Sequence, residues 1–201
     1  MVNMKQKIKL IQEKIGVTAD GVIGPQTVGA LMAALGVKES AAAAEVPAWP
    51  TQKQVRSGKS IFGAPGSSRL VRIVPPYPLY FEGAKVGSIS VHEVIARHVE
   101  QALQEVLDVY GIQRIKALGL DQYGGCYNYR QTTRGGSLSM HAWGIALDFC
   151  PDGNGMSTHA PAATLSHPDC APWWEIWERH GAVSMGRVHD KDWMHLQFAK
   201  F

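Results

Sequence analysis

One segment of the sequence, residues 37–47, reads VKESAAAAEVP and has no apolar stripe that could face a core. We therefore predict a linker that divides the chain into residues 1–36 and residues 48–201. The first part is too short to bury a sizeable core by itself, because small chains bury a small share of their surface. The main hydrophobic core must therefore form within residues 48–201.

Residues 1–36 are predicted to form a small all-α module of two helices joined by a turn. Gly16 and Gly36 follow the last turn of each helix, and Pro25 suits the first turn of the second. The apolar residues that recur at helical spacing are Met4, Ile8, Ile11 and Ile15, then Val28, Leu31, Met32 and Leu35. Two such helices bury little, so we expect the module to be marginally stable alone.

Residues 48–201 are predicted to mix helices and strands. A long helix is expected at 90–110, where Ser90 and Glu93 form a capping-box pattern and Gly111 follows. Its buried stripe would contain Val91, Val94, Ile95, Val99, Ala102, Leu103, Val106, Leu107 and Tyr110. A second helix is expected at 172–180, and its inward side chains would be Trp173, Ile176 and Trp177. The Pro-rich stretch 73–81 is interpreted as irregular or as an edge strand.

Two further segments, 144–149 and 193–198, are typical of strands. In the first, Ile145, Leu147 and Phe149 would face the core, whereas Ala146 and Asp148 would face away. In the second, Met194, Leu196 and Phe198 alternate with His195 and Gln197. The pattern predicts an α+β fold in which a small antiparallel sheet with flanking helices carries a metal site.

The charge of the chain excludes one class of partner. Lys plus Arg number 20 and Asp plus Glu number 17, which gives +3. This excess is too small for a dedicated nucleic-acid binder, although it is compatible with an anionic substrate.

No apolar run is long enough for a membrane helix, so no membrane insertion is expected. The first residues lack a secretory signal pattern, which predicts synthesis in the cytoplasm.

The polar residues of the two predicted strands suit a zinc site. Catalytic zinc is held by three protein ligands plus water, and His nitrogen and carboxylate oxygen are common ligands. His141 and Asp148 supply two such ligands, and His195 supplies the third. The competing interpretation is that some of the eight histidines lie near an aspartate by chance.

The sequence around these residues resembles a known family. Residues 139–148 fit S-x-H-x-x-G-x-A-x-D, and Asp192 and His195 fit D-x-x-H. Both patterns resemble the M15 peptidases, zinc enzymes that include D-Ala-D-Ala carboxypeptidases and phage L-alanyl-D-glutamate endopeptidases. Residues 123–130 and 134–136 are similar to the segment that precedes the first pattern in the phage-type branch. The resemblance covers about residues 48–201 and implies a zinc peptidase domain.

The resemblance also implies residue roles. The zinc ligands would be His141, Asp148 and His195. Asp192 would be the general base for a metal-activated water, in a position where the family often has Glu. Arg130 would steady the negative charge that develops on the scissile carbonyl, and Ser139 would hydrogen-bond the substrate backbone.

Several of these roles have alternatives. Asp192 lies three residues before His195, so it must lie on the turn that enters the strand rather than on the strand itself. Arg134 competes with Arg130, and Ser139 would instead cap or brace a loop. His189 is a possible spare ligand or substrate contact, although a surface histidine is the simpler interpretation.

The three cysteines, Cys126, Cys150 and Cys170, are too few for a disulfide framework. They are interpreted as buried small residues. A disulfide between Cys150 and Cys170 stays an alternative if the protein leaves the cytoplasm. Cys150 shares its strand parity with Asp148, which makes an approach of its thiol to the metal a further alternative.

A second, shorter resemblance lies in the first module. Asp20-Gly21-x-x-Gly24-x-x-Thr27 is similar to the peptidoglycan-binding module of cell-wall hydrolases, although the helix that usually precedes it is absent. Both resemblances together imply a monomeric phage endolysin that binds bacterial peptidoglycan, is made in the host cytoplasm and acts on the wall after release. L-alanyl-D-glutamate endopeptidase is the first hypothesis. The alternatives are a D-Ala-D-Ala carboxypeptidase and a non-catalytic, zinc-containing wall-binding protein.

Overall fold

The computed structural model describes residues 2–36, 48–133 and 135–201. The chain divides into two compact units, Met1–Glu45 and Val46–Phe201, and each is described by itself. The predicted linker at 37–47 lies outside the described residues. Within the described ranges, no helix is both long and apolar enough to cross a bilayer.

The first unit contains the two predicted helices, α1 (Met4–Lys14) and α2 (Pro25–Ala34). Their apolar residues bury little, as predicted: Ile8, Ile15, Leu31 and Met32 are only half-buried. Met4 and Leu35 are each 71% exposed, and Ile11 and Val28 are exposed as well. Two helices have too little facing surface to cover these side chains, so a polar residue holds the unit together instead.

Gln12 is that residue, with only 1% of its surface exposed. Its Nε2 donates to Asp20 Oδ1 at 2.7 Å and to Thr27 Oγ1 at 3.0 Å. Its Oε1 accepts from the backbone N–H of Gly21 at 2.8 Å, where the backbone has a φ of +80° that favours glycine. One amide therefore joins α1, the turn and α2.

We expect Gln12→Leu to destabilise the first unit although it preserves volume. The apolar side chain leaves the buried Gly21 N–H and the Thr27 hydroxyl without their partner, which costs about 1–3 kcal/mol for each unsatisfied group. Amide hydrogen exchange in α1 should become much faster. Gln26→Leu, at an exposed position on α2, is the matched control. Equal exchange rates in both variants would contradict this role for Gln12.

The second unit is built on a four-stranded antiparallel sheet whose order is β5 (Tyr123–Gly125), β6 (Ala146–Phe149), β8 (His195–Gln197) and β7 (Val183–Ser184). The two predicted strands 144–149 and 193–198 are therefore present in shortened form as β6 and β8. They pair in a register that places Asp148 directly opposite His195. The α+β prediction, with small antiparallel sheets, is confirmed at this level.

Two strand pairs lie beside this sheet. Strand β1 (Leu70–Ile73) pairs with β4 (Ile89–His92), and β2 (Leu79–Phe81) pairs with β3 (Ala84–Val86). Because β1 and β2 flank residues 74–78, the stretch 73–81 is partly strand and partly irregular, in line with its prediction.

The helix predicted at 90–110 has the wrong bounds. Residues 89–92 form β4, and helix α4 spans Ala96–Ala117. The Glu93 carboxylate pairs with Arg69 at 2.7 Å rather than completing a capping box. Alternating Ile89 and Val91 pack inward from β4, so sheet pairing overrides the local helix-start pattern. Gly111, with a φ of +65° and a ψ of 159°, is non-helical and divides α4 into two helices, so the helix stop predicted at this glycine is confirmed.

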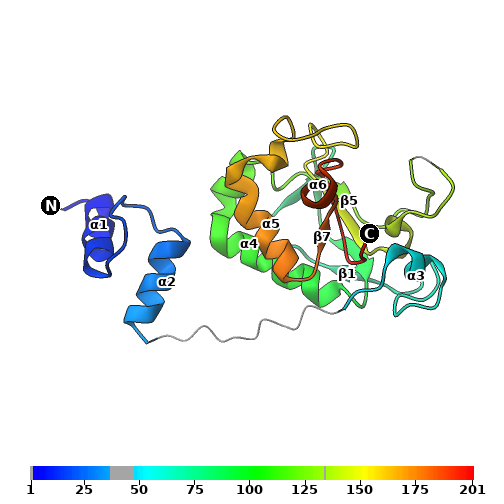
Figure 1. Cartoon of the computed structure of the whole chain (residues 1–201), viewed down its shortest axis with the longest axis horizontal. Helices are drawn as coiled ribbons and strands as arrows, with labels where there is room; N and C mark the ends of the chain where they lie inside the picture. The colour runs from blue at the N-terminus through cyan, green and yellow to red at the C-terminus, as the bar shows by residue number, and fades with distance from the viewer. Residues whose placement is uncertain (1, 37–47, 134) are drawn as a thin grey trace. The chain divides into compact units, whose positions relative to one another are not determined.

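Helix α5 (Ala171–Arg179) confirms the second predicted helix within a residue. It lies beside α4 (Figure 1), and the Tyr110 hydroxyl of α4 accepts a hydrogen bond from the Trp173 N–H at 2.9 Å. Trp173, Ile176 and Trp177 are buried as predicted, and Trp174 is buried with them. The tryptophans are thus part of the core.

The remaining helices are short. They are α3 (Gln52–Arg56), α6 (Met185–His189) and the 3-10 turns η1 (Met140–Trp143), η2 (Thr164–Ser166) and η3 (Pro168–Cys170). The C-terminal segment returns to α3, because Thr51 forms a β-bridge with Lys200. This return places α3 beside the end of β8.

Candidate metal centre

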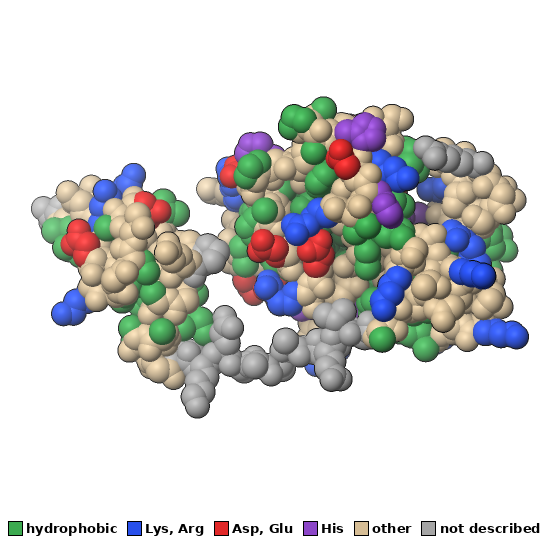
Figure 2. Space-filling model, in the orientation of Figure 1, with side chains coloured by type: hydrophobic (Ala, Val, Ile, Leu, Met, Phe, Trp, Pro, Cys, Tyr) green, Lys and Arg blue, Asp and Glu red, His purple; other side chains and the backbone are tan. Residues whose placement is uncertain are grey.

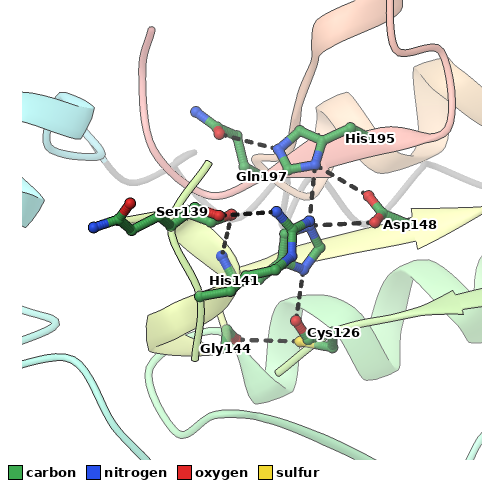
Figure 3. A network of polar contacts seen from close by, with 9 residues as sticks. Cys126, Ser139, His141, Gly144, Asp148, His195 and Gln197 are labelled. Carbon is green, nitrogen blue, oxygen red and sulfur yellow. Dashed lines mark hydrogen bonds and ion pairs between the residues drawn. The ribbon is translucent and has the colours of Figure 1, made fainter. Parts of the chain in front are cut away.

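Three buried side chains, His141, Asp148 and His195, converge in the second unit (Figure 3). Asp148 on β6 and His195 on β8 are direct cross-strand partners, which places their side chains on one face of the sheet. The sequence predicted this pair from strand alternation. In the described part of the chain, these residues form the one group of three His, Cys, Asp or Glu side chains able to hold a metal ion.

His141 comes from η1, which has a distinct start and end. The Ser139 hydroxyl accepts from the His141 N–H at 3.4 Å and begins the turn. Gly144 ends it with a φ of +66°. A Cβ on Gly144 would lie 2.5 Å from Leu70 Cδ2, so both the conformation and the packing require glycine. The turn therefore holds His141 over the sheet.

The ligand atoms are spaced as a tetrahedral ion requires. His141 Nε2 lies 3.2 Å from His195 Nδ1, which lies 3.0 Å from Asp148 Oδ1. His141 Nε2 lies 3.3 Å from Asp148 Oδ2. Tetrahedral zinc with bonds of ~2.0–2.2 Å separates its ligand atoms by about 3.3–3.6 Å. The three side chains thus fit such an ion with only slight spreading.

Hydrogen bonds prepare the donor atoms of this group. His141 Nδ1–H donates to the Cys126 carbonyl at 2.6 Å, which leaves a lone pair on Nε2 facing the group. Burial would raise the pKa of Asp148, but the polar contacts of its carboxylate with the His141 and His195 rings hold that pKa well below its usual range. Burial would lower the pKa of His195, but the Asp148 carboxylate raises it. The carboxylate therefore stays ionised.

Asp192 lies beside the metal group on the turn that enters β8. Its φ of +50° is left-handed, and its carbonyl accepts from the His195 N–H at 2.9 Å. The turn resolves the spacing problem, because Asp192 and His195 need not share a strand. Asp192 Oδ1 is buried and has no hydrogen-bond partner among the described residues. Burial raises the pKa of this carboxyl, whereas a bound cation would lower it.

Ser139 and Arg130 both line the pocket that contains the metal group. Ser139 is buried and caps η1, so it has the capping role that was named as the alternative to substrate binding. Arg130 is exposed and donates to the Gln131 carbonyl at 3.2 Å. Its competitor Arg134 lies outside the described residues.

The pocket is lined by side chains of different character. They include the cationic Arg56 and Arg130, and the methionines Met156, Met185 and Met194. On the face shown in Figure 2, Lys and Arg side chains gather around α3, whereas Asp and Glu gather over α4 and α5. The pocket can therefore receive a ligand with both anionic and small apolar groups.

Two residues named as alternatives lie apart from the centre. The Sγ of Cys150 donates to the Gly119 carbonyl at 2.7 Å. The φ of Cys150 is +49°, so this residue does not continue the strand alternation that suggested a metal contact. His189 is exposed at the end of α6 and packs against Phe201. All three cysteines are buried and free, as the interpretation of small core residues requires.

Three neighbours of the centre were not predicted, namely Gln52, Arg56 and Gln197. Gln197 follows His195 by two residues on an alternating strand, so the pattern placed it on the ligand face without assigning it a role. Gln52 and Arg56 lie on α3 and carry no local signal, because they meet β8 only through the fold.

No family model, curated protein or solved structure matches this chain. The resemblance to zinc peptidases therefore stays a prediction from the motifs.

Proposed function

We propose that this protein is a zinc-dependent peptidoglycan hydrolase that cleaves an amide bond of the stem peptide. The observation that carries the proposal is the pairing of two features in one pocket. The ring nitrogens of His141 and His195 lie 3.2 Å apart, and each lies within 3.3 Å of a carboxylate oxygen of Asp148. The buried, unpartnered Oδ1 of Asp192 belongs to a residue that lines the same pocket. A structural metal site needs no such free carboxylate, whereas hydrolysis needs a base.

When bound, zinc would activate a water molecule and polarise the scissile carbonyl. Asp192 accepts the proton of the attacking water through its free oxygen and passes it to the departing amine. Arg130 contributes positive charge at the pocket wall, where an oxyanion develops. The Ser139 hydroxyl, which also caps η1, hydrogen-bonds the substrate backbone from the lining of the same pocket.

The stem peptide suits the mixed lining of the pocket. Its D-glutamyl carboxylate would pair with a guanidinium of Arg56 or Arg130, and the alanyl methyl group would contact the methionines. This arrangement favours cleavage between L-alanine and D-glutamate. The sequence resemblance to the phage-type branch supports the same bond.

The first unit would raise the concentration of the enzyme at the wall, as its motif resemblance implies. Gln12→Leu, which should unfold that unit, is expected to reduce adsorption to intact sacculi. Hydrolysis of soluble muropeptides should not change.

Clearing of permeabilised bacteria tests the proposal. The turbidity of the suspension should fall with the zinc-loaded protein, stay constant with a chelator and fall again when zinc is restored. Binding to the cells without clearing would support the non-catalytic alternative and overturn the proposal of an enzyme.

A further inference from the structure

The two histidines of the metal group face it with different ring nitrogens (Figure 3). His141 presents Nε2, whereas His195 presents Nδ1 and turns its Nε2 toward Gln197 Oε1 at 3.2 Å. A neutral imidazole carries one hydrogen, so Nδ1 of His195 can bind a metal only when that hydrogen is on Nε2. Whatever accepts from Nε2 therefore decides whether His195 is a ligand.

The side chain of Gln197 is held in one orientation. It is fully buried, its Nε2 donates to the Ala199 carbonyl at 2.6 Å, and its Oε1 accepts from Gln52 Nε2 at 3.0 Å. If the amide turned over, its oxygen would face a carbonyl oxygen and its nitrogen would face the nitrogen of Gln52. Both contacts would be lost, so Oε1 is fixed toward His195.

Arg56 sets the direction of this chain of hydrogen bonds. Its guanidinium can only donate, and it does so from one NH2 group to Gln52 Oε1 at 2.9 Å. Because the oxygen of Gln52 faces Arg56, its nitrogen must face Gln197. Arg56 Nε donates to the Leu138 carbonyl at 2.9 Å, which fixes the guanidinium in turn.

We propose that Gln197, oriented by Gln52 and Arg56, is a positioning residue that keeps the hydrogen of His195 on Nε2 and so makes Nδ1 the metal ligand. This relay rests on the metal site of the proposed function. It gives α3 a role at the metal centre, although its residues are distant in sequence, with 145 positions between Gln52 and Gln197.

Gln52→Glu tests the direction of the relay with little change in shape. A carboxylate can only accept, so it keeps Arg56 but cannot donate to Gln197. The Gln197 oxygen would then face a carboxylate, and turning the amide over would instead set that oxygen against the Ala199 carbonyl. Either arrangement weakens the acceptor that keeps the hydrogen of His195 on Nε2. Outer-shell partners of ligating histidines typically change metal affinity by 10–100-fold, and we expect a loss of that size.

Gln54→Glu is the matched control, because it adds the same charge to the same helix at an exposed position. Gln54 completes the capping box with Thr51, and a glutamate there preserves it. Gln52→Met removes the hydrogen bonds without reversing them and should weaken zinc binding only a few-fold. Zinc affinity is measured by competition with a chromophoric chelator, and melting curves establish that each variant is folded.

The alternative is that these hydrogen bonds only hold α3 against β8 and do not affect the metal ligand. In that case Gln52→Glu would bind zinc as tightly as Gln54→Glu or more tightly, because the added negative charge attracts a cation. That result would overturn the proposal.

Long-range proton–nitrogen NMR of the wild-type chain is an independent measurement. In the zinc-loaded chain, the Nε2–H of His195 is expected to be hydrogen-bonded to Gln197 and therefore protected from exchange with water. That protection should be lost in Gln52→Glu and kept in Gln54→Glu, and equal exchange in both variants would overturn the relay. This readout does not need hydrolysis. A protein that holds this tautomer but does not cleave peptidoglycan would contradict the proposed function and leave the relay standing.

Discussion

Asp192→Asn is expected to bind zinc like the wild-type chain, to remain folded and to lose most of its turnover on peptidoglycan. The amide keeps the shape of the side chain but cannot take a proton, and proton transfer by a positioned carboxylate typically contributes ~10²–10⁴-fold. Asp192 is suited to this role because its Oδ1 is buried without a partner in the described chain, next to the metal group. The rate of muropeptide hydrolysis measures the effect.

Asp152→Asn is the control for this prediction, since Asp152 is exposed. Asp192→Glu should retain partial activity, because it restores the carboxylate one methylene further out. If Asp192→Asn hydrolyses the wall at nearly the wild-type rate with zinc bound, another group must be the base.

Replacing His141 or His195 with Ala is expected to abolish both metal binding and hydrolysis. Each substitution removes one of three protein ligands, and the two ligands that remain are too few to retain the zinc ion. Elemental analysis of the purified variants should find about one zinc per wild-type chain and none in either variant. Asp148→Asn should weaken binding as well, because a neutral amide replaces the ionised carboxylate.

His189→Ala provides the matched control, because His189 is exposed at the end of α6. It should retain full zinc and full activity. An active His195→Ala variant, or a wild-type preparation that is active without metal, would contradict the assignment of these ligands.

Strand alternation predicted the metal group well, since Asp148 and His195 each face away from apolar neighbours in their own segment. Their pairing required only that the two strands be neighbours, and the register then placed them opposite each other. The position of Asp192 on a turn also followed from its spacing to His195. These predictions depend on local pattern, which the sequence displays directly.

Contacts between segments distant in the sequence could not be predicted from local pattern. Ser90 and Glu93 look like a helix start, but pairing with Leu70–Ile73 makes the segment a strand. No local signal separates these outcomes, because the partner strand decides between them. In the same way, Gln52 reaches β8 only after the C-terminal segment has returned to α3.

The first unit shows a different limit. Its apolar spacing correctly predicted helices, but periodicity alone cannot tell whether a stripe is covered. Gln12 lies between apolar residues of α1 and carries the hydrogen bonds that hold the unit together. A polar residue at a buried position is visible only once the turn that it binds is in place.

Mass spectrometry of peptidoglycan digested by the zinc-loaded protein tests the central claim most directly. The account predicts fragments cut between L-alanine and D-glutamate, each cleavage adding one water and exposing one new amine. Asp192→Asn, loaded with the same amount of zinc, should yield almost none of them. Peptidoglycan that is unchanged by the wild-type protein, or cut at its sugar bonds instead, would contradict the account.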